Sequence, residues 1–203
     1  MQIPFRSIDS PTVKKWFVIL QLLAFTVFPW NQAKAVDSIV VFNELHYNPA
    51  ATEEAQEFVE LYNQNVVNVD ISGWSLDGGV DFTFAEGTVI DGNGYIVIAA
   101  DVAVFGEAHP GMTALGPYTG NLGNGGDTVI LRNNSGRIMD EITYGDRYPW
   151  PVAADGGGAT LAKIDGLTVS EFPENWRASS EHGGTPGAFN FEEPWAPGED
   201  PVE

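Results

Sequence analysis

Hydrophobic side chains recur at every second position through most of this chain after residue 38, which is the spacing of β-strands. One stretch places Phe58, Glu60 and Tyr62 on one face of a strand and Val59 and Leu61 on the other. The same pattern predicts strands at 39–47, 57–63, 67–71, 74–76, 82–84, 95–100 (apolar throughout, as in a strand buried on both faces), 128–132, 138–144 and 159–164.

Glycine-rich and asparagine-rich turns separate these strands, and many short strands joined by such turns predict an all-β sandwich or barrel. The stretch 101–121 lacks a clean period, so we expect a helical turn at 101–105 followed by a long loop. The predicted core consists of inward-facing apolar residues, namely Val59, Leu61, Trp74, Leu76, Ile96, Ile98, Val129 and Leu131.

The first 35 residues follow a different pattern, that of a secretory signal peptide. Lys14 and Lys15 precede the largely apolar run 16–30, and Ala33 and Ala35 supply small residues before the expected cleavage site. The apolar run is shorter than the roughly 20 residues that a membrane span needs, although a retained anchor or a buried helix is the competing interpretation. We therefore expect a protein that is secreted or at the cell surface, without a membrane span after residues 1–35 are removed.

Composition divides the remainder into a domain at 36–190 and an acidic, proline-rich tail at 191–203, which is typical of a disordered linker. A sequence that stops in a linker suggests a fragment of a longer protein. The chain has no cysteine, so stability must come from the core rather than from disulfides.

Charge narrows the classes of partner. The chain has nine basic and 28 acidic residues, and four of the basic residues and one of the acidic residues lie in the first 35 positions. Residues 36–203 therefore hold five basic and 27 acidic residues, which gives a net charge of −22. Such a surface disfavours nucleic-acid binding through a basic patch and disfavours anionic lipids. It is compatible with basic proteins, with cations or simply with solubility.

Several motifs, in order, resemble the lamin-tail domain family, in particular its bacterial secreted members. They are Val41-Phe42-Asn43-Glu44-Leu45-His46-Tyr47-Asn48-Pro49, Glu57-Phe58-Val59-Glu60-Leu61-Tyr62-Asn63, Ile71-Ser72-Gly73-Trp74-Ser75-Leu76, Phe82-Thr83-Phe84, the run at 94–99, the glycine-rich stretch at 122–127, the stretch at 136–145, Asn175-Trp176-Arg177-Ala178 and Gly184-Thr185-Pro186-Gly187-Ala188-Phe189-Asn190.

The resemblance spans about residues 38–190 and implies an immunoglobulin-like β-sandwich without a demonstrated catalytic centre. Bacterial relatives of this kind are mostly exported, often beside hydrolase, nuclease or kinase-like spore-coat domains. The motifs themselves favour an architectural interpretation, with Gly73 and Gly187 in turns and Trp176 covering an end of the sandwich.

Two groups of residues that contain acids are candidates for a catalytic or metal site. Glu44 and His46 share a strand face and could bind zinc or act as a base and its orienter, but a hydrogen-bonded structural histidine is the more ordinary interpretation. Glu57 and Glu60 fall on opposite faces, so they do not form a carboxylate pair. If Glu60 is buried, it needs a donor such as Arg132 or Arg177.

The remaining candidates lie in predicted loops. Asp91-Gly92-Asn93-Gly94 and the glycine-rich stretch 120–127 have a faint likeness to calcium and phosphate loops but lack their spacing, so only weak calcium binding is left open. His109 and His182 are isolated in sequence. Ser179 lies close to His182 in sequence, but closeness in sequence does not give the geometry of a catalytic triad.

Exposed aromatic side chains could stack on sugars, and Tyr148, Trp150 and Trp195 are the candidates, although packing against the sandwich edge is the common outcome. We assign no catalytic, cofactor-binding or metal-binding residue, and expect a non-catalytic interaction or adhesion module whose partner is a protein or a cell-surface polymer. The alternatives are an accessory module of a larger exported enzyme and a carbohydrate-binding module.

Overall fold

A computed structural model describes residues 38–50 and 56–191. The predicted signal peptide and the tail after Phe191, including Trp195, lie outside the described residues. The elements are β1 Val40–His46, β2 Phe58–Asn63, β3 Val69–Asp70, β4 Ser75–Gly78, β5 Val80–Thr83, β6 Val89–Ile90, β7 Tyr95–Ala99, α1 Val102–Ala108, β8 Thr119–Gly120, β9 Gly126–Arg132, β10 Ile138–Gly145, η2 Val152–Ala154, β11 Leu161–Lys163, η3 Pro173–Asn175 and β12 Trp176–Ala178.

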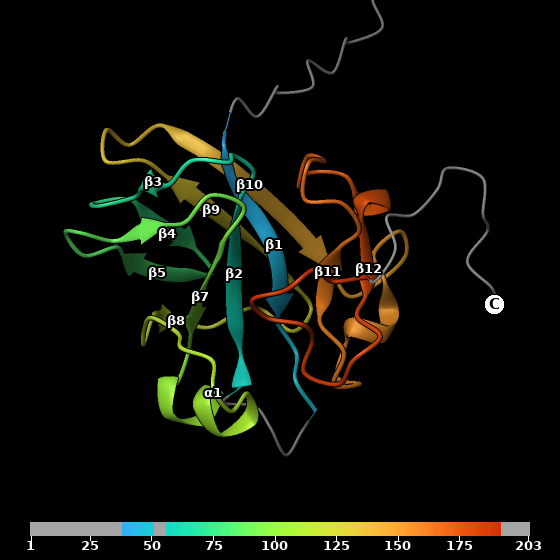
Figure 1. The fold of residues 1–203 in the computed structure, drawn as a ribbon. Helices are drawn as coiled ribbons and strands as arrows, with labels where there is room; N and C mark the ends of the chain where they lie inside the picture. Colours follow the sequence, from blue (N-terminus) through green and yellow to red (C-terminus); the bar gives the residue numbers. More distant parts are fainter. Residues whose placement is uncertain (1–37, 51–55, 192–203) are drawn as a thin grey trace, which may run out of the picture. The chain divides into compact units, whose positions relative to one another are not determined.

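The strands form two five-stranded sheets and a short two-stranded one (Figure 1). The first sheet has the order β12-β11-β1-β2-β7, the second has the order β10-β9-β4-β5-β8, and β3 pairs with β6. The pairs of named strands are antiparallel. The predicted fold class, an immunoglobulin-like β-sandwich, is confirmed.

The predicted core residues fill the space between the two sheets. Six of them are fully buried, Trp74 is 8 % exposed, and Ile96 packs against the cluster while only partly buried. The fully buried six come from strands of both sheets: Val59, Leu61, Leu76, Ile98, Val129 and Leu131.

The first sheet is buried on both faces at its centre, because every residue of β1 and β2 is buried. The face turned away from the second sheet carries Phe58 and Glu60. Phe58 packs edge-on against Phe105 of α1, with ring centroids 5.6 Å apart. Glu60 is covered by the chain around Gly187, which donates a main-chain hydrogen bond to it. The hydrophobic pattern did not show what covers this outer face, and the structure shows that α1 and the chain around Gly187 bury it at Phe58 and Glu60.

The helical turn predicted at 101–105 is confirmed and extends to Ala108 as α1. Its N-cap is Asp101, whose carboxylate accepts hydrogen bonds from the main-chain N–H groups of Ala103 and Val104 at 2.9 and 3.1 Å. The loop that follows is not wholly irregular as predicted, because its residues 119–120 form β8 and pair with β5. This two-residue strand is too short to leave a period in the sequence.

The strand predicted at 67–71 is wrong in length. Only Val69 and Asp70 pair, and Val67 is 57 % exposed. The alternating pattern at 67–71 included Val67, which lies in a loop and does not pair with another strand.

Truncation of a core residue should destabilise the domain strongly. We expect Leu131→Ala to lower the free energy of unfolding by about 2–5 kcal/mol, because it removes transfer free energy and leaves a cavity. Val67→Ala, at an exposed position, should change it by less than about 0.5 kcal/mol. Urea titration followed by tryptophan fluorescence measures both, and equal losses would contradict the assignment of the core.

Candidate functional site

Glu44 and Glu60 lie directly opposite each other on the neighbouring strands β1 and β2, and both are fully buried. Glu44 accepts a hydrogen bond from the hydroxyl of Thr160 at 2.5 Å. It also accepts from the main-chain N–H of Thr185, at 3.0 Å to Oε1 and 3.2 Å to Oε2. The side chain that was a candidate metal ligand is thus bonded to two distant parts of the chain.

Glu60 is satisfied in the same way by neutral donors. The amide of Asn43 donates to Oε1 at 2.7 Å, and the main-chain N–H of Gly187 donates to Oε2 at 2.5 Å. Arg132, one of the two arginines expected to balance this carboxyl, instead pairs with Asp77. Main-chain N–H groups can replace a cation because a buried carboxyl needs donors more than it needs a formal charge.

The segment that supplies these main-chain donors is residues 184–190, which we call the closing segment. Gly184 has φ +80° and Gly187 has φ +78°, both in the left-handed region that favours glycine. A Cβ on Gly184 would collide with the carboxyl of Glu44. Gly184 therefore lets the main chain approach Glu44 closely, whereas a Cβ on Gly187 would meet the side chain of Met112.

Burial raises the pKa of Glu44 to about 7, against the lowering effect of its hydrogen bonds to Thr160 and Thr185. Burial and the nearby charge of Glu44 raise the pKa of Glu60 well above its ordinary value. Perturbed carboxyls often mark active sites. Here the closing segment covers both of them, so the pair has a structural environment rather than access to a substrate.

His46 does not extend the pair into a metal site. Its ring lies edge-on to Phe58, with centroids 5.6 Å apart, in an aromatic cluster that also contains Phe105 and His109. Burial lowers the pKa of His109. Within residues 38–50 and 56–191, no group of three histidine, aspartate or glutamate side chains has the arrangement of a metal site.

Glu57 lies apart from Glu60, as predicted. Its carboxylate accepts hydrogen bonds from the hydroxyl of Tyr118 at 3.0 Å and from the main-chain N–H of Leu122 at 3.1 Å. It therefore anchors the loop that follows α1.

A second buried network joins the two sheets and was missed by sequence reasoning. Asp140 of β10 accepts from the main-chain N–H of Phe42 at 2.8 Å and from the hydroxyl of Ser170 at 2.6 Å. The ammonium of Lys163 in β11 donates to Ser170 at 2.7 Å. Burial lowers the pKa of Lys163 to about 8, while the charge of Asp140 opposes that shift.

The sequence did contain a signal for this network. Asp140 has the same strand parity as the buried Ile142 and Tyr144, and Lys163 lies within an otherwise apolar strand. A charged residue at an inward position in each of two strands predicts a buried pair, although which strands meet is not visible locally.

Asn190 ends the closing segment by binding the sheet itself. Its amide donates to the main-chain carbonyl of Asn43 at 3.1 Å and to that of Lys163 at 2.9 Å. Asn43 lies where the β1–β2 register shifts, so its carbonyl is released from regular pairing. The last residue of the motif at 184–190 thus satisfies a β-bulge.

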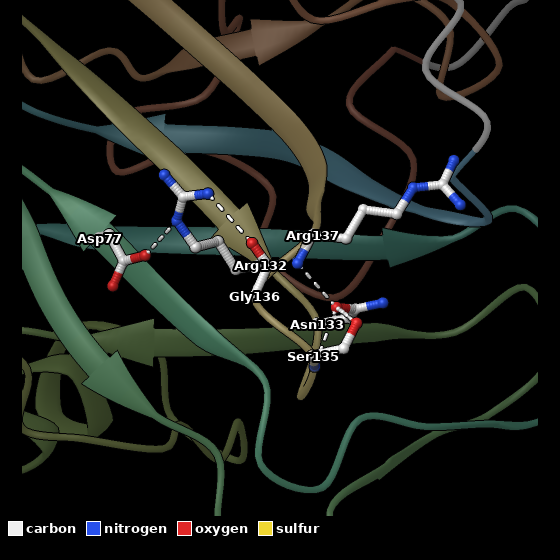
Figure 2. A network of polar contacts seen from close by, with 6 residues as sticks. All are labelled: Asp77, Arg132, Asn133, Ser135, Gly136 and Arg137. Carbon is white, nitrogen blue, oxygen red and sulfur yellow. Dashed lines mark hydrogen bonds and ion pairs between the residues drawn. The ribbon is translucent and has the colours of Figure 1, made fainter.

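The hairpin between β9 and β10 is held by surface contacts (Figure 2). Arg132 donates from Nε to Asp77 at 2.7 Å and from Nη1 to the carbonyl of Gly136 at 3.2 Å. Asn133 accepts from the main-chain N–H groups of Ser135 and Arg137 at 3.1 and 3.0 Å. In Figure 2 the guanidinium of Arg137 points away from the pair formed by Asp77 and Arg132. These contacts shape a turn and do not assemble a reactive group.

The calcium-like loop is a turn in which Asp91 is already engaged. Its carboxylate accepts from the amide of Asn68 at 2.9 Å, its carbonyl accepts from the N–H of Gly94 at 2.9 Å, and Asn93 has φ 54°. In the glycine-rich stretch 120–127, the carboxylate of Asp127 accepts from the N–H of Gly123 at 3.2 Å. Weak calcium binding stays a prediction.

Ser179 is also a structural residue. Its hydroxyl accepts from the main-chain N–H of Thr160 at 2.9 Å and donates to the carbonyl of Glu181 at 2.7 Å. The ring of His182 lies against Gly158 instead. The structure therefore gives Ser179 no nucleophile geometry.

The two described aromatic candidates for a sugar-binding face differ in exposure. Tyr148 is 92 % exposed, whereas Trp150 packs against the core and contacts Gly145. Of these two residues, only Tyr148 is therefore largely exposed.

The strand orders, the core and the closing segment define an immunoglobulin-like sandwich module. A family model described as Lamin Tail Domain matches residues 33–146, and this chain belongs to that family. A search of curated proteins found no match. The strands β11 and β12 and the closing segment lie after the matched residues, and the two strands complete the first sheet. Among the described residues, no helix is long and apolar enough to cross a membrane.

The stability of this protein should fall as the pH rises towards and through neutrality. A carboxyl whose folded-state pKa is about 7, against about 4.5 unfolded, stabilises the fold fully below pH 4.5, and this contribution is lost as the pH rises through 7. For Glu44 the loss is on the order of 3 kcal/mol. Glu44→Gln should remove this part of the slope in the free energy of unfolding between about pH 4.5 and pH 7.

The matched control for that measurement is Glu86→Gln, at an exposed position, which should retain the wild-type slope. The pKa of Asp140 is also raised by burial, so some slope should persist in Glu44→Gln. Identical pH profiles for wild type and Glu44→Gln would show that Glu44 is ionised in the folded protein.

Loss of Lys163 should leave Asp140 buried without its compensating charge. We expect Lys163→Met to lower the free energy of unfolding by about 3 kcal/mol. Arg147→Met, at a side chain that is 89 % exposed, should be nearly neutral. Chemical denaturation of each variant gives these values. If the double variant with Asp140→Asn is no more stable than Lys163→Met alone, the two charges are not coupled.

Proposed function

We propose that this chain is a non-catalytic interaction or adhesion module, secreted or held at the cell surface, whose partner is a protein or a cell-surface polymer. The observation that carries the proposal is that the two carboxyls with raised pKa are bonded within the fold. Glu44 and Glu60 are both closed off by main-chain N–H groups of the closing segment. The groups best suited to acid–base chemistry thus hold the sandwich together.

Membership of the lamin-tail family supports the same conclusion, because it is a family of immunoglobulin-like domains. In such sandwiches the loops and strand edges are the surfaces left for partners. The strongly acidic composition favours a neutral or basic partner over nucleic acid or anionic lipid.

Export is the second part of the proposal and depends on residues 1–35. The test is to express the full chain with a C-terminal tag in a secreting bacterial host, fractionate the cells and determine the N-terminus by mass spectrometry. We expect product in the medium or on the surface, beginning near Val36. Product retained in the cytosol with residues 1–35 attached would contradict export.

Binding is tested on the same product with intact cells. The fluorescently labelled mature protein should bind cell surfaces saturably, and Leu131→Ala, which disturbs the core, should bind less at a temperature where it is unfolded. Absence of saturable binding to any envelope fraction would contradict an adhesion role.

A further inference from the structure

A pocket of about 840 Å³ opens on the outer side of the first sheet, beside the closing segment. Its walls are the ends of β2 and β7, the turn at 163–167 that follows β11, and residues 188–191 at the end of the described chain. Elements far apart in sequence therefore meet around one concave surface.

One wall of the pocket is aromatic and held in place. The rings of Tyr62 and Tyr95 lie against each other with centroids 4.9 Å apart and planes tilted by 31°. The main chain of Gly166 lies over the ring of Tyr62, since a Cβ there would come within 2.8 Å of it. On the rim, Leu167 is 69 % exposed and Phe189 is 79 % exposed. Tyr62 itself is only 8 % exposed, so the apolar surfaces available to a ligand at little cost in reorganisation are those of Tyr95, Leu167 and Phe189.

The floor of the pocket is rigid. Asn43, Lys163 and Asn190 are nearly fully buried, and their side chains are engaged in hydrogen bonds within the protein. The ammonium of Lys163 donates to the carbonyl of Thr168 and to Ser170, so it is not presented to a ligand. Among the described residues that line it, the pocket thus offers no cation to a phosphate, sulfate or carboxylate group.

Other polar groups in the walls make no hydrogen bond to the described residues. These are the hydroxyls of Tyr62 and Tyr95 and the amide of Asn93. Asp165 uses one carboxylate oxygen for the N–H of Leu167 and leaves the other available. Burial raises the pKa of Tyr95, so its hydroxyl keeps its proton and can donate. Aromatic faces beside hydroxyl, amide and carboxylate groups match a ligand that is flat and apolar on one side and rich in hydroxyls at its edges.

We propose that this pocket, between Tyr62, Tyr95 and Phe189, binds a neutral saccharide unit. The inference deepens the proposed function and rests on it, because it names a neutral polysaccharide as the cell-surface polymer. The acidic surface and the engaged Lys163 disfavour an anionic glycan. The site differs from the Tyr148 and Trp150 region, where only Tyr148 is well exposed.

The test uses isothermal titration calorimetry of the mature protein with cellotetraose, xylotetraose, maltotetraose and chitotetraose, and with a heparin tetrasaccharide as the anionic comparison. We expect at least one neutral sugar to bind. Phe189→Ala and Asn93→Ala should each weaken that binding about tenfold. Tyr148→Ala, an exposed aromatic elsewhere, is the matched control and should bind as wild type does.

Four results would overturn the proposal. Three of them are no binding of any neutral sugar, equal affinity in Phe189→Ala and wild type, and tighter binding of the heparin fragment. The fourth is tighter binding of the uncharged apolar dye N-phenyl-1-naphthylamine at a site lost in Phe189→Ala, which would assign the pocket to an apolar partner. Thermal unfolding of each variant separates loss of binding from loss of folding.

Cell binding distinguishes failure of this inference from failure of the proposed function. If Phe189→Ala and Asn93→Ala bind intact cells as wild type does, the pocket is not the docking site but the adhesion role stands. If wild type binds sugar but no cell surface, the saccharide site stands and the adhesion role fails.

Discussion

The pairing of Glu44 with Glu60 is the constraint on which the rest of this domain depends. Two carboxyls buried side by side on neighbouring strands are costly unless each receives hydrogen bonds. The donors include Thr160 and the main chain of Thr185 and Gly187. The closing segment must therefore return across the outer face of the first sheet, and the part of that face around the two acids becomes interior.

The network around Asp140 plays the corresponding role between the two sheets. Asp140 binds the main chain of β1 next to the bulge, and Ser170 links it to Lys163 in β11. Asn190 completes the arrangement at the bulge itself. A buried polar network of this kind specifies one register, since a shifted strand would leave its members without partners. Lys163 and Asn190 also form the floor of the pocket on the outer side of the sheet.

The groups that can serve a function are those that these structural contacts do not engage. The acids of the family motifs, Glu44 and Glu60, are used to close the fold, and Ser179 is used to hold a loop. Groups that remain without such a role lie nearer the surface, where Tyr95 and Phe189 border a pocket. This division between structural and available groups is the physical basis for proposing a binding role rather than a catalytic one.

The sequence by itself determined the strand periodicity, the core residues such as Leu76 and Leu131, and the helical turn capped by Asp101, because each depends on contacts between residues close in sequence or on simple burial. Only the tertiary structure decided that Glu60 would accept hydrogen bonds from Asn43 and Gly187 while Arg132 pairs with Asp77, and that Lys163 would share a network with Asp140. These contacts join positions far apart in sequence, across strands whose order and register no local pattern encodes.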